Sequence, residues 1–375
     1  MTSIALDTVE CRALPPSPVR VFSTRLESLR GLAALAVALY HSVSVFEAEP
    51  QWQSLNRALQ LIGSGGGPVF LFFVLSGYVL ALSLRDDLLQ PDNKQIARSI
   101  ASYYFRRAAR LFPLLFFVIG ISFVLQWQTP APLQDDLTPF AKAVMVPVHG
   151  VRELTKNILL FSSSIVPVAW TLRIELFWSI LLPAIVASQI FLSRNYGLLL
   201  LVGLVAAQVF FQPGYSIHYG FAFYLGAALI HARHARYPGF IALIGLAMIW
   251  VVPLLSDDRT VKDLVFAVAS GAIVFGVVNA RTKMSFLEWS PVRFLGRISY
   301  SFYLWHWIVL FELTVVIRHV FPELTGIFGN VVLFGVLISV TVLISSFTYQ
   351  FIEVPCMNFA RKLSKTHQAI AWGRL

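Results

Sequence analysis

The chain has 375 residues, of which 57% are hydrophobic and only 13% charged, and its mean hydropathy is +0.72. A soluble domain carries about a quarter charged residues, so this composition excludes a soluble globular protein and indicates a polytopic membrane protein. The net charge of +10 is what an excess of lysine and arginine on cytoplasmic loops produces, and we expect no nucleic acid partner.

Apolar segments of membrane length recur along the whole chain. Ten are predicted, at residues 31–46, 68–84, 111–127, 172–192, 197–211, 217–231, 239–255, 264–279, 299–317 and 328–351. With the N-terminus inside, the segments on the inner side hold 21 of the 29 lysines and arginines. This bias predicts an all-α bundle of about ten transmembrane helices with both termini cytoplasmic.

Two connections differ from short turns. The longest, residues 128–169, is expected outside, where it would cap the bundle or touch an external substrate. Within it, residues 158–168 are too short to span and are predicted as an interfacial or re-entrant stretch. The sequence GSGGG at 63–67 lacks the Lys-Ser/Thr that follows a phosphate-binding loop and is predicted as a turn before the second helix.

The first apolar helix carries Arg30 and His41, eleven residues apart. At about 100° per residue they return to within roughly 20° of the same face, about 16 Å apart along the axis. An ionisable group inside a membrane is costly and marks a functional site or a buried polar pair. A neutral imidazole can remove a proton from a hydroxyl, so His41 is a candidate general base, with a structural hydrogen bond as the alternative.

The fourth apolar helix places Glu175 in a run whose only other charge is Arg173. We predict that Glu175 lies at a depth similar to His41 and that the carboxylate orients the imidazole. A pair between Glu175 and Arg173 is disfavoured, because residues two apart on a helix face different ways.

Three other features carry candidates. Arg107 and Arg110 share a face at the cytoplasmic end of the third helix, where they suit phosphate binding as well as ordinary positive-inside flanking. His306, between two tryptophans of the ninth helix, has a structural and a functional interpretation of equal weight. Ser76 and Gly77 in the second helix are predicted to permit a close helix contact.

Taken together and in this order, these stretches resemble the acyltransferase-3 family of integral membrane acyltransferases. The matching pieces, which run from residue 26 to residue 355, are LESLRG followed by His41, FFVLSGYVL, RRAARLFP, AWTLRIELFW, LGRISYSFYLWH and FIEVP. Each piece alone is a weak signal, whereas six in order are specific. The resemblance implies a cytoplasmic N-terminal tail at 1–24, an acyltransferase-3 transmembrane domain at 25–357 and a cytoplasmic C-terminal tail at 358–375.

The resemblance also implies a reaction. An acetyl or other short acyl group passes from cytoplasmic acetyl-CoA or another acyl-CoA to a carbohydrate hydroxyl at the outer face, with no metal. The expected acceptor is a polysaccharide such as a lipopolysaccharide or exopolysaccharide, a lipid-linked glycan or an oligosaccharide. Membrane lipid is the expected surrounding partner, and the expected location is the inner or plasma membrane.

Residue by residue, the resemblance assigns His41 and Glu175 to catalysis and Arg30, Arg107 and Arg110 to the acyl-CoA site. We further predict that four residues contact the substrates, namely Trp170, Arg173, Tyr303 and His306. Direct transfer and an acyl-histidine intermediate both stay open. The alternative function is a transporter or exporter of a glycan or small molecule, although the repeated halves and broken helices typical of transporters are not evident.

Overall fold

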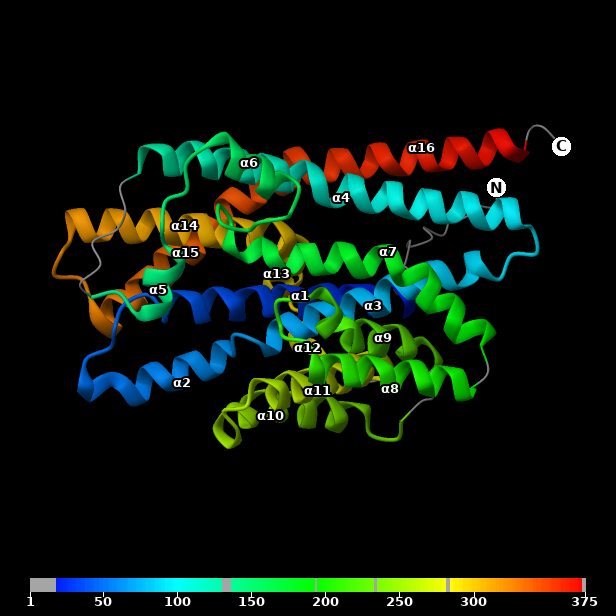
Figure 1. Cartoon of the computed structure of the whole chain (residues 1–375), viewed down its shortest axis with the longest axis horizontal. Coiled ribbons are helices and arrows are strands. Elements are labelled where there is room, and N and C mark those ends of the chain that lie inside the picture. Colours follow the sequence, from blue (N-terminus) through cyan, green and yellow to red (C-terminus); the bar gives the residue numbers. More distant parts are fainter. Residues whose placement is uncertain (1–17, 130–135, 193, 233–234, 281–283, 373–375) are drawn as a thin grey trace, which may run out of the picture.

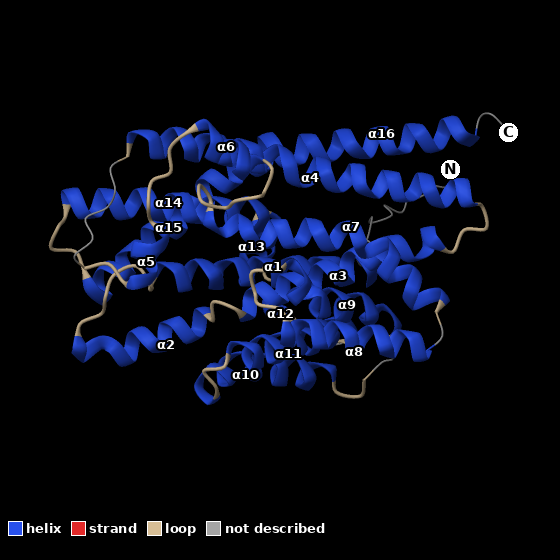
Figure 2. Cartoon of the chain, viewed as in Figure 1, coloured by secondary structure: helices blue, strands red, loops and turns tan. Residues whose placement is uncertain are grey.

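The computed structural model describes residues 18–129, 136–192, 194–232, 235–280 and 284–372. Within these ranges the chain is built from helices and contains no strand (Figure 2). One isolated bridge joins Phe46 to Leu137. The predicted all-α class is confirmed.

The long helices run side by side along the long axis of the molecule (Figure 1). They are α1 (Pro18–Ser42), α3 (Gly67–Leu88), α4 (Asn93–Gln128), α7 (Trp170–Phe191), α8 (Arg194–Phe210), α10 (Pro238–Leu255), α11 (Arg259–Asn279), α14 (Ser299–Val320), α15 (Gly326–Thr348) and α16 (Val354–Trp372). Shorter helices connect them: η1 (Pro50–Trp52), α2 (Gln53–Gly63), α5 (Pro139–Val144), α6 (Val151–Ile158), η2 (Pro167–Ala169), η3 (Ser216–Tyr219), α9 (Gly220–Ala228), η4 (Leu229–His231), α12 (Ser285–Glu288), α13 (Ser290–Arg297) and the π-helical η5 (Tyr349–Glu353).

Among the described residues, seven helical stretches are long and apolar enough to cross a membrane. They contain α3, α4, α7, α10, α11, α14 and α15. The three other predicted segments are also helical, but α1 carries four charged residues in the half before Gly31, α8 has 17 residues and α9 has nine. The chain is a multi-pass membrane protein, and the predicted count of ten spans is approximate.

Large apolar side chains cover the outward faces of several helices, as a surface in contact with lipid requires. Exposed examples on α4, α8, α10 and α15 are Phe116, Phe117, Leu199, Val202, Leu243, Leu254, Leu343 and Phe347. The polar groups that carry the candidate chemistry lie on the inner faces of the bundle instead.

The two ends of the bundle differ in construction. The α2 end, at the left of Figure 1, carries α2, α5 and the turn between α14 and α15. The α16 end, at the right, carries the turn between α3 and α4, and the first half of α4 packs along α16. The predicted boundary at 357/358 falls inside α16, and residues 1–17 of the predicted tail lie outside the described residues.

The turn predicted at GSGGG joins α2 to α3, where Ser64 adopts a left-handed φ of 40°. The close helix contact predicted at Gly77 is also found. A Cβ atom on Gly77 would lie 2.3 Å from the carbonyl oxygen of Phe223, and one on Gly226 would lie 2.2 Å from the carbonyl oxygen of Val74. Helices α3 and α9 therefore touch backbone to backbone, which only glycine permits.

We predict that Gly226→Val lowers the thermal unfolding midpoint of the purified protein in detergent, because the added methyl groups must push α9 away from α3. Overpacking of this kind costs about 1–3 kcal/mol. The matched control is Gly203→Val on α8, where no atom lies within 4 Å of an added Cβ. Equal midpoints for the two variants would contradict the proposed backbone contact.

Candidate active site

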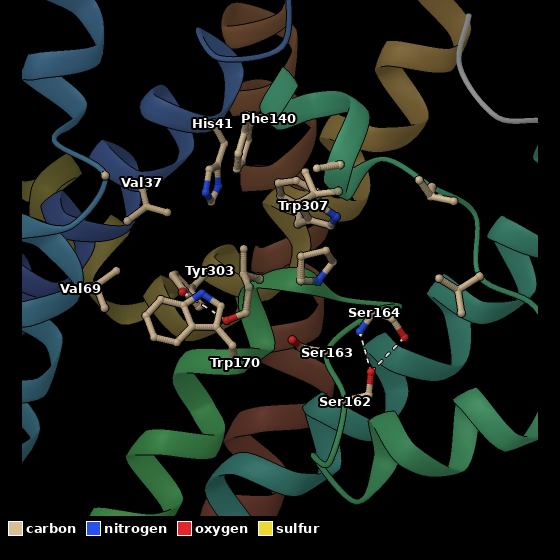
Figure 3. Close-up of a pocket in the computed structure, with 17 residues that line it drawn as sticks. Val37, His41, Val69, Phe140, Ser162, Ser163, Ser164, Trp170, Tyr303 and Trp307 are labelled. Atoms are coloured by element: carbon tan, nitrogen blue, oxygen red, sulfur yellow. Dashed lines mark hydrogen bonds between the residues drawn. The ribbon is translucent and has the colours of Figure 1, made fainter. Parts of the chain in front are cut away.

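A cavity of about 510 Å³ opens beside His41 (Figure 3). Its walls come from α1, the start of α3, α5 with the segment after it, the loop that leads into η2, the start of α7, and α14. The long connection at 128–169 thus forms a large part of the cavity wall. Its described residues cap the bundle, which is one of the two arrangements predicted from the sequence.

The cap is tied directly to the helix that carries His41. The amide of Thr138 donates to the carbonyl of Val45 at 2.9 Å, and the amide of Glu47 donates to the carbonyl of Asp136 at 3.0 Å. These bonds bring α5 against α1, and the ring of Phe140 stacks on the imidazole of His41 with centroids 5.8 Å apart and planes 14° apart. One wall of the cavity is therefore fixed relative to the imidazole.

The imidazole of His41 is paired with a second imidazole. His41 Nδ1 lies 3.0 Å from Nε2 of His306, and the two rings are parallel to within 5°. His306 is fully buried, and its Nδ1 lies 2.6 Å from the carbonyl oxygen of Tyr303. A chain of two hydrogen bonds thus runs from the backbone of α14 to the ring of His41.

This chain determines which nitrogen of His41 is free. A carbonyl oxygen only accepts, so Nδ1 of His306 carries a hydrogen and donates it to Tyr303. His306 is buried, and no carboxylate among the described residues is hydrogen-bonded to it, which favours the neutral ring. Its Nε2 then accepts from Nδ1 of His41, and Nε2 of His41 keeps a lone pair. Figure 3 shows the His41 ring pointing into the cavity.

The end of α1 is held by one side chain of α15. The buried Asn330 accepts from the amide of Phe46 at 3.0 Å and donates to the carbonyls of Phe46 and Val43 at 3.0 and 3.3 Å. Because α1 ends at Ser42, His41 lies in its last turn, where a helix would otherwise fray. Asn330 satisfies the backbone groups that follow and steadies that turn.

Glu175 does not pair with His41, which corrects the predicted orienting pair. Its Oε1 forms an ion pair with Arg107 of α4 and accepts a hydrogen bond from Oγ of Ser76 at 2.8 Å. The predicted depth was wrong because Trp170, where α7 begins, already lines the cavity. Glu175 is five residues further along, about 7.5 Å deeper into the bundle.

A second polar cluster therefore lies inward of the cavity, and we name it the arginine cluster. It contains Arg30, Arg107 and Arg110 with Glu175 and Glu353, which lie within electrostatic range of one another. Arg107 is neutralised by Glu175, whereas no ion pair of Arg30 or Arg110 is found among the described residues. Helix α1 is unbroken from Pro18 to Ser42, so Arg30 and His41 share a face as predicted.

The four predicted substrate-contacting residues divide into two groups. Trp170 and Tyr303 line the cavity. The hydroxyl of Tyr303 accepts from Thr171 at 3.0 Å and so ties α14 to α7. His306 lies behind His41 and reaches the cavity only through it. Arg173 is not among the residues that line the cavity and lies near Tyr219 instead.

Sequence reasoning missed several residues of these two sites. Ser76 was predicted only as a small residue, yet it binds Glu175. Glu353 is buried in the π-helical turn, where it accepts from Ser301. The signal for Glu353 was its place in FIEVP. The hydroxyl wall of the cavity, Ser162–Ser164, carried no signal beyond its place in the external connection.

No group of three or more histidine, cysteine, aspartate or glutamate side chains within the described ranges is arranged to hold a metal ion. The two histidines and the two glutamates of these sites, His41, His306, Glu175 and Glu353, bind one another or neighbouring hydroxyl and carbonyl groups. Proton transfer by His41 and phosphate binding by arginine are the chemistries that these side chains offer.

Fold and composition define the class of this protein as a multi-pass membrane protein. The model of the acyltransferase-3 family, described as an acyltransferase domain, matches residues 24–350. The chain belongs to this family, as the resemblance predicted.

Among proteins of known function, the chain is similar to O-acetyltransferase OatA of Staphylococcus aureus, in strains NCTC 8325 / PS 47, COL and MRSA252. It is 24% identical to each over an alignment 386 positions long, and the alignment covers 93% of this chain. The chain spans 60% of the length of these relatives. No solved structure matches it.

We predict that Arg107→Leu and Glu175→Leu each lower the thermal unfolding midpoint in detergent, and that the double variant regains part of the loss. Each single change leaves a buried charge without its partner, which costs about 3–5 kcal/mol, whereas the double variant removes both charges of the pair. Arg106→Leu, whose guanidinium binds Ser102 one turn away, is the control. Additive losses in the double variant would contradict a direct ion pair.

Proposed function

We propose that this protein transfers an acetyl or other short acyl group from cytoplasmic acyl-CoA to a hydroxyl of an exported or cell-surface carbohydrate. The observation that carries the proposal is the His306–His41 hydrogen-bond chain, which leaves an unprotonated imidazole nitrogen facing a cavity. Family membership and the similarity to an O-acetyltransferase support acetyl transfer to oxygen. The α16 end is cytoplasmic and the α2 end faces outward, in agreement with the positive-inside bias of the sequence.

The acyl donor binds from the α16 end. Its phosphate groups are held by Arg30 and Arg110, because Arg107 is already paired with Glu175. Arginine suits this role since its planar guanidinium binds phosphate with two parallel hydrogen bonds. The pantetheine arm extends along the face of α1 that joins Arg30 to His41, a distance of about 16 Å, and delivers the thioester to the cavity.

The acceptor hydroxyl enters the cavity from the α2 end. Nε2 of His41 removes its proton while the oxygen attacks the thioester carbonyl carbon. The tetrahedral intermediate expels the CoA sulfur, which takes the proton back from His41, so that an ester and free CoA leave. His306 accepts from Nδ1 of His41 throughout, which fixes the ring orientation and disperses the charge on the imidazolium.

Glu175 is a positioning residue in this scheme. With Ser76 it holds Arg107 in place, so that α3, α4 and α7 meet at a fixed point beside Arg30 and Arg110. Its carboxylate also limits the net positive charge of the arginine cluster, which keeps three guanidinium groups in one place inside the bundle.

The first test uses purified protein in detergent with acetyl-CoA, and measures CoA release together with ester formation on sugar acceptors by mass spectrometry. We predict that His41→Ala lowers kcat by about 10²–10⁴-fold, the usual contribution of a general base. His306→Phe, which keeps a ring but cannot accept a hydrogen bond, lowers kcat by about tenfold, the effect of one hydrogen bond. His306→Gln restores an acceptor and recovers part of the rate.

The matched control for both histidines is His319→Ala, near the end of α14, whose imidazole binds only the carbonyl of Val315 among the described residues. Its kcat should equal that of the unmodified protein. Retained transfer by well-folded His41→Ala would overturn the role of His41. Equal rates for His306→Phe and His306→Gln, at equal unfolding midpoints, would reduce His306 to a packing residue.

We predict that Arg110→Ala raises the KM for acetyl-CoA with little change in kcat, because it removes a contact to the donor phosphates far from the reacting atoms. The loss of a hydrogen bond between charged groups, about 1.5–3 kcal/mol, corresponds to roughly a tenfold to hundredfold rise. Arg106→Ala, one turn away on α4, should leave KM unchanged. A KM that responds equally to both substitutions would argue against a phosphate site at Arg110.

A further inference from the structure

The cavity beside His41 is lined, among the described residues, without a single aspartate, glutamate, lysine or arginine. Its ionisable groups are His41 itself and the phenol of Tyr303, whose oxygen is already within hydrogen-bond distance of Thr171 and of the carbonyl of Val168. Valines, aromatic rings and three serines make up most of the remaining wall. The acceptor site thus offers no counter-charge to a ligand.

Two ion pairs lie close to the cavity wall. Glu153 of α6 pairs with Lys156 on the same helix and receives a hydrogen bond from Ser164 at 3.4 Å. The hydrogen bond from Lys156 lowers the pKa of Glu153, so a carboxylate stands directly behind the serine wall. Asp136, at the start of the cap, pairs with Arg318. An anionic ligand in the cavity would face the Glu153 carboxylate behind the serines and, among the described lining residues, no lysine or arginine.

The polar part of the wall consists of three consecutive serines, Ser162–Ser164. Ser162 and Ser164 bind each other at 3.2 Å, and Asn157 donates to Ser164 at 3.0 Å. The hydroxyl of Ser163 has no partner among the described residues and lines the cavity. Figure 3 places these serines across the cavity from His41. They can exchange hydrogen bonds with hydroxyl groups of a bound sugar.

The opposite part of the wall is aromatic. Trp170, Tyr303 and Trp307 line the cavity together with Phe140, and Figure 3 shows Trp170 and Tyr303 next to each other below the His41 ring. Flat aromatic rings pack well against the C–H face of a pyranose ring, which is apolar. Such a cavity, mostly apolar with a few polar groups, determines the orientation of a ligand.

Together these features disfavour the binding of a charged sugar in the cavity. A carboxylate, sulfate or phosphate transferred from water to this cavity would lose its hydration without gaining a partner, at a large cost in free energy. An uncharged sugar loses less, because the serines replace some of its hydrogen bonds to water and the rings cover its apolar face. Selectivity of this kind rests on unpaired polar groups in the disfavoured complex.

We propose that the acceptor hydroxyl is presented by an uncharged sugar residue, and that sugars carrying a carboxylate, sulfate or phosphate on the acylated ring are excluded. This inference rests on the proposed function, since it names the substrate class of the same site. Only the ring that enters the cavity is restricted; charges on more distant parts of a glycan stay in water.

The test compares matched acceptors with purified protein and acetyl-CoA. The pairs are 4-nitrophenyl β-D-glucoside with the corresponding glucuronide, and 4-nitrophenyl β-D-galactoside with the corresponding galacturonide, each product being quantified by mass spectrometry. We expect kcat/KM for the uncharged member of a pair to be at least tenfold higher. Equal rates within the pairs would overturn this inference and leave the proposed function intact.

Two other outcomes are also decisive. If His41-dependent release of CoA is seen but no uncharged sugar is acetylated, the inference about the acceptor is wrong. If acetyl-CoA is neither bound nor cleaved, and His41→Ala changes nothing, the proposed function itself fails. The two failures are therefore separated by the CoA assay, which needs no sugar.

A charge placed in the wall should reverse the preference. Ser163→Arg adds a cation where a sugar carboxylate would lie, and we expect it to raise the relative rate on the glucuronide by tenfold or more. Val146→Lys, at an exposed position of the same wall, is the second variant should Ser163→Arg fail to fold. The control is Thr155→Arg, which adds the same charge on exposed α6 outside the lining. An unchanged preference in folded Ser163→Arg and Val146→Lys would contradict the inference.

Discussion

The hydrogen bond between His41 and His306 is the interaction on which the candidate active site depends. An imidazole within a membrane bundle is of use as a base only if one nitrogen is reliably free of hydrogen. Here the backbone carbonyl of Tyr303 fixes the tautomer of His306, and His306 in turn fixes that of His41. No carboxylate is needed, so the free nitrogen is obtained without burying a negative charge beside the cavity.

The carboxylates of the two sites lie in the arginine cluster and not beside the cavity. This separation of charged groups from the cavity is the main organising feature of the bundle interior. Glu175 and Glu353 lie among the three arginines, on the side of the bundle interior away from the cap. One helix, α1, carries a member of each site, Arg30 and His41. A charged region suited to an anionic donor and an uncharged cavity suited to a neutral acceptor are thus set a fixed distance apart on a single rigid element. In the proposed reaction, this arrangement would keep the two substrates apart until their reacting atoms meet.

Much of this architecture could be predicted from the sequence, and the part that could not has a physical cause. Composition and periodicity predicted the helical membrane bundle, and the motif order predicted the family. The spacing of Arg30 and His41 predicted their shared face, because both lie on one helix whose geometry is fixed. The predicted partner of His41 was wrong. Which side chain lies beside His41 depends on where each of the separate helices begins along the membrane normal, and the sequence does not fix this. Residues 165–169 enter the bundle, so α7 starts beside the cavity, and Glu175 lies deeper than His41, next to Arg107.

The hydrogen bonds from Asn330 to the end of α1 have a consequence for the biosynthesis of the protein. His41 is synthesised early, in the first helix, yet the groups that complete its surroundings belong to α14 and α15, the last two long helices before α16. A chain still emerging from the ribosome has its base but neither the ring that orients it nor the amide that secures its helix. The surroundings of His41 are therefore complete only when biosynthesis is nearly finished, and truncated chains without these two helices lack both the His306 ring and the Asn330 amide.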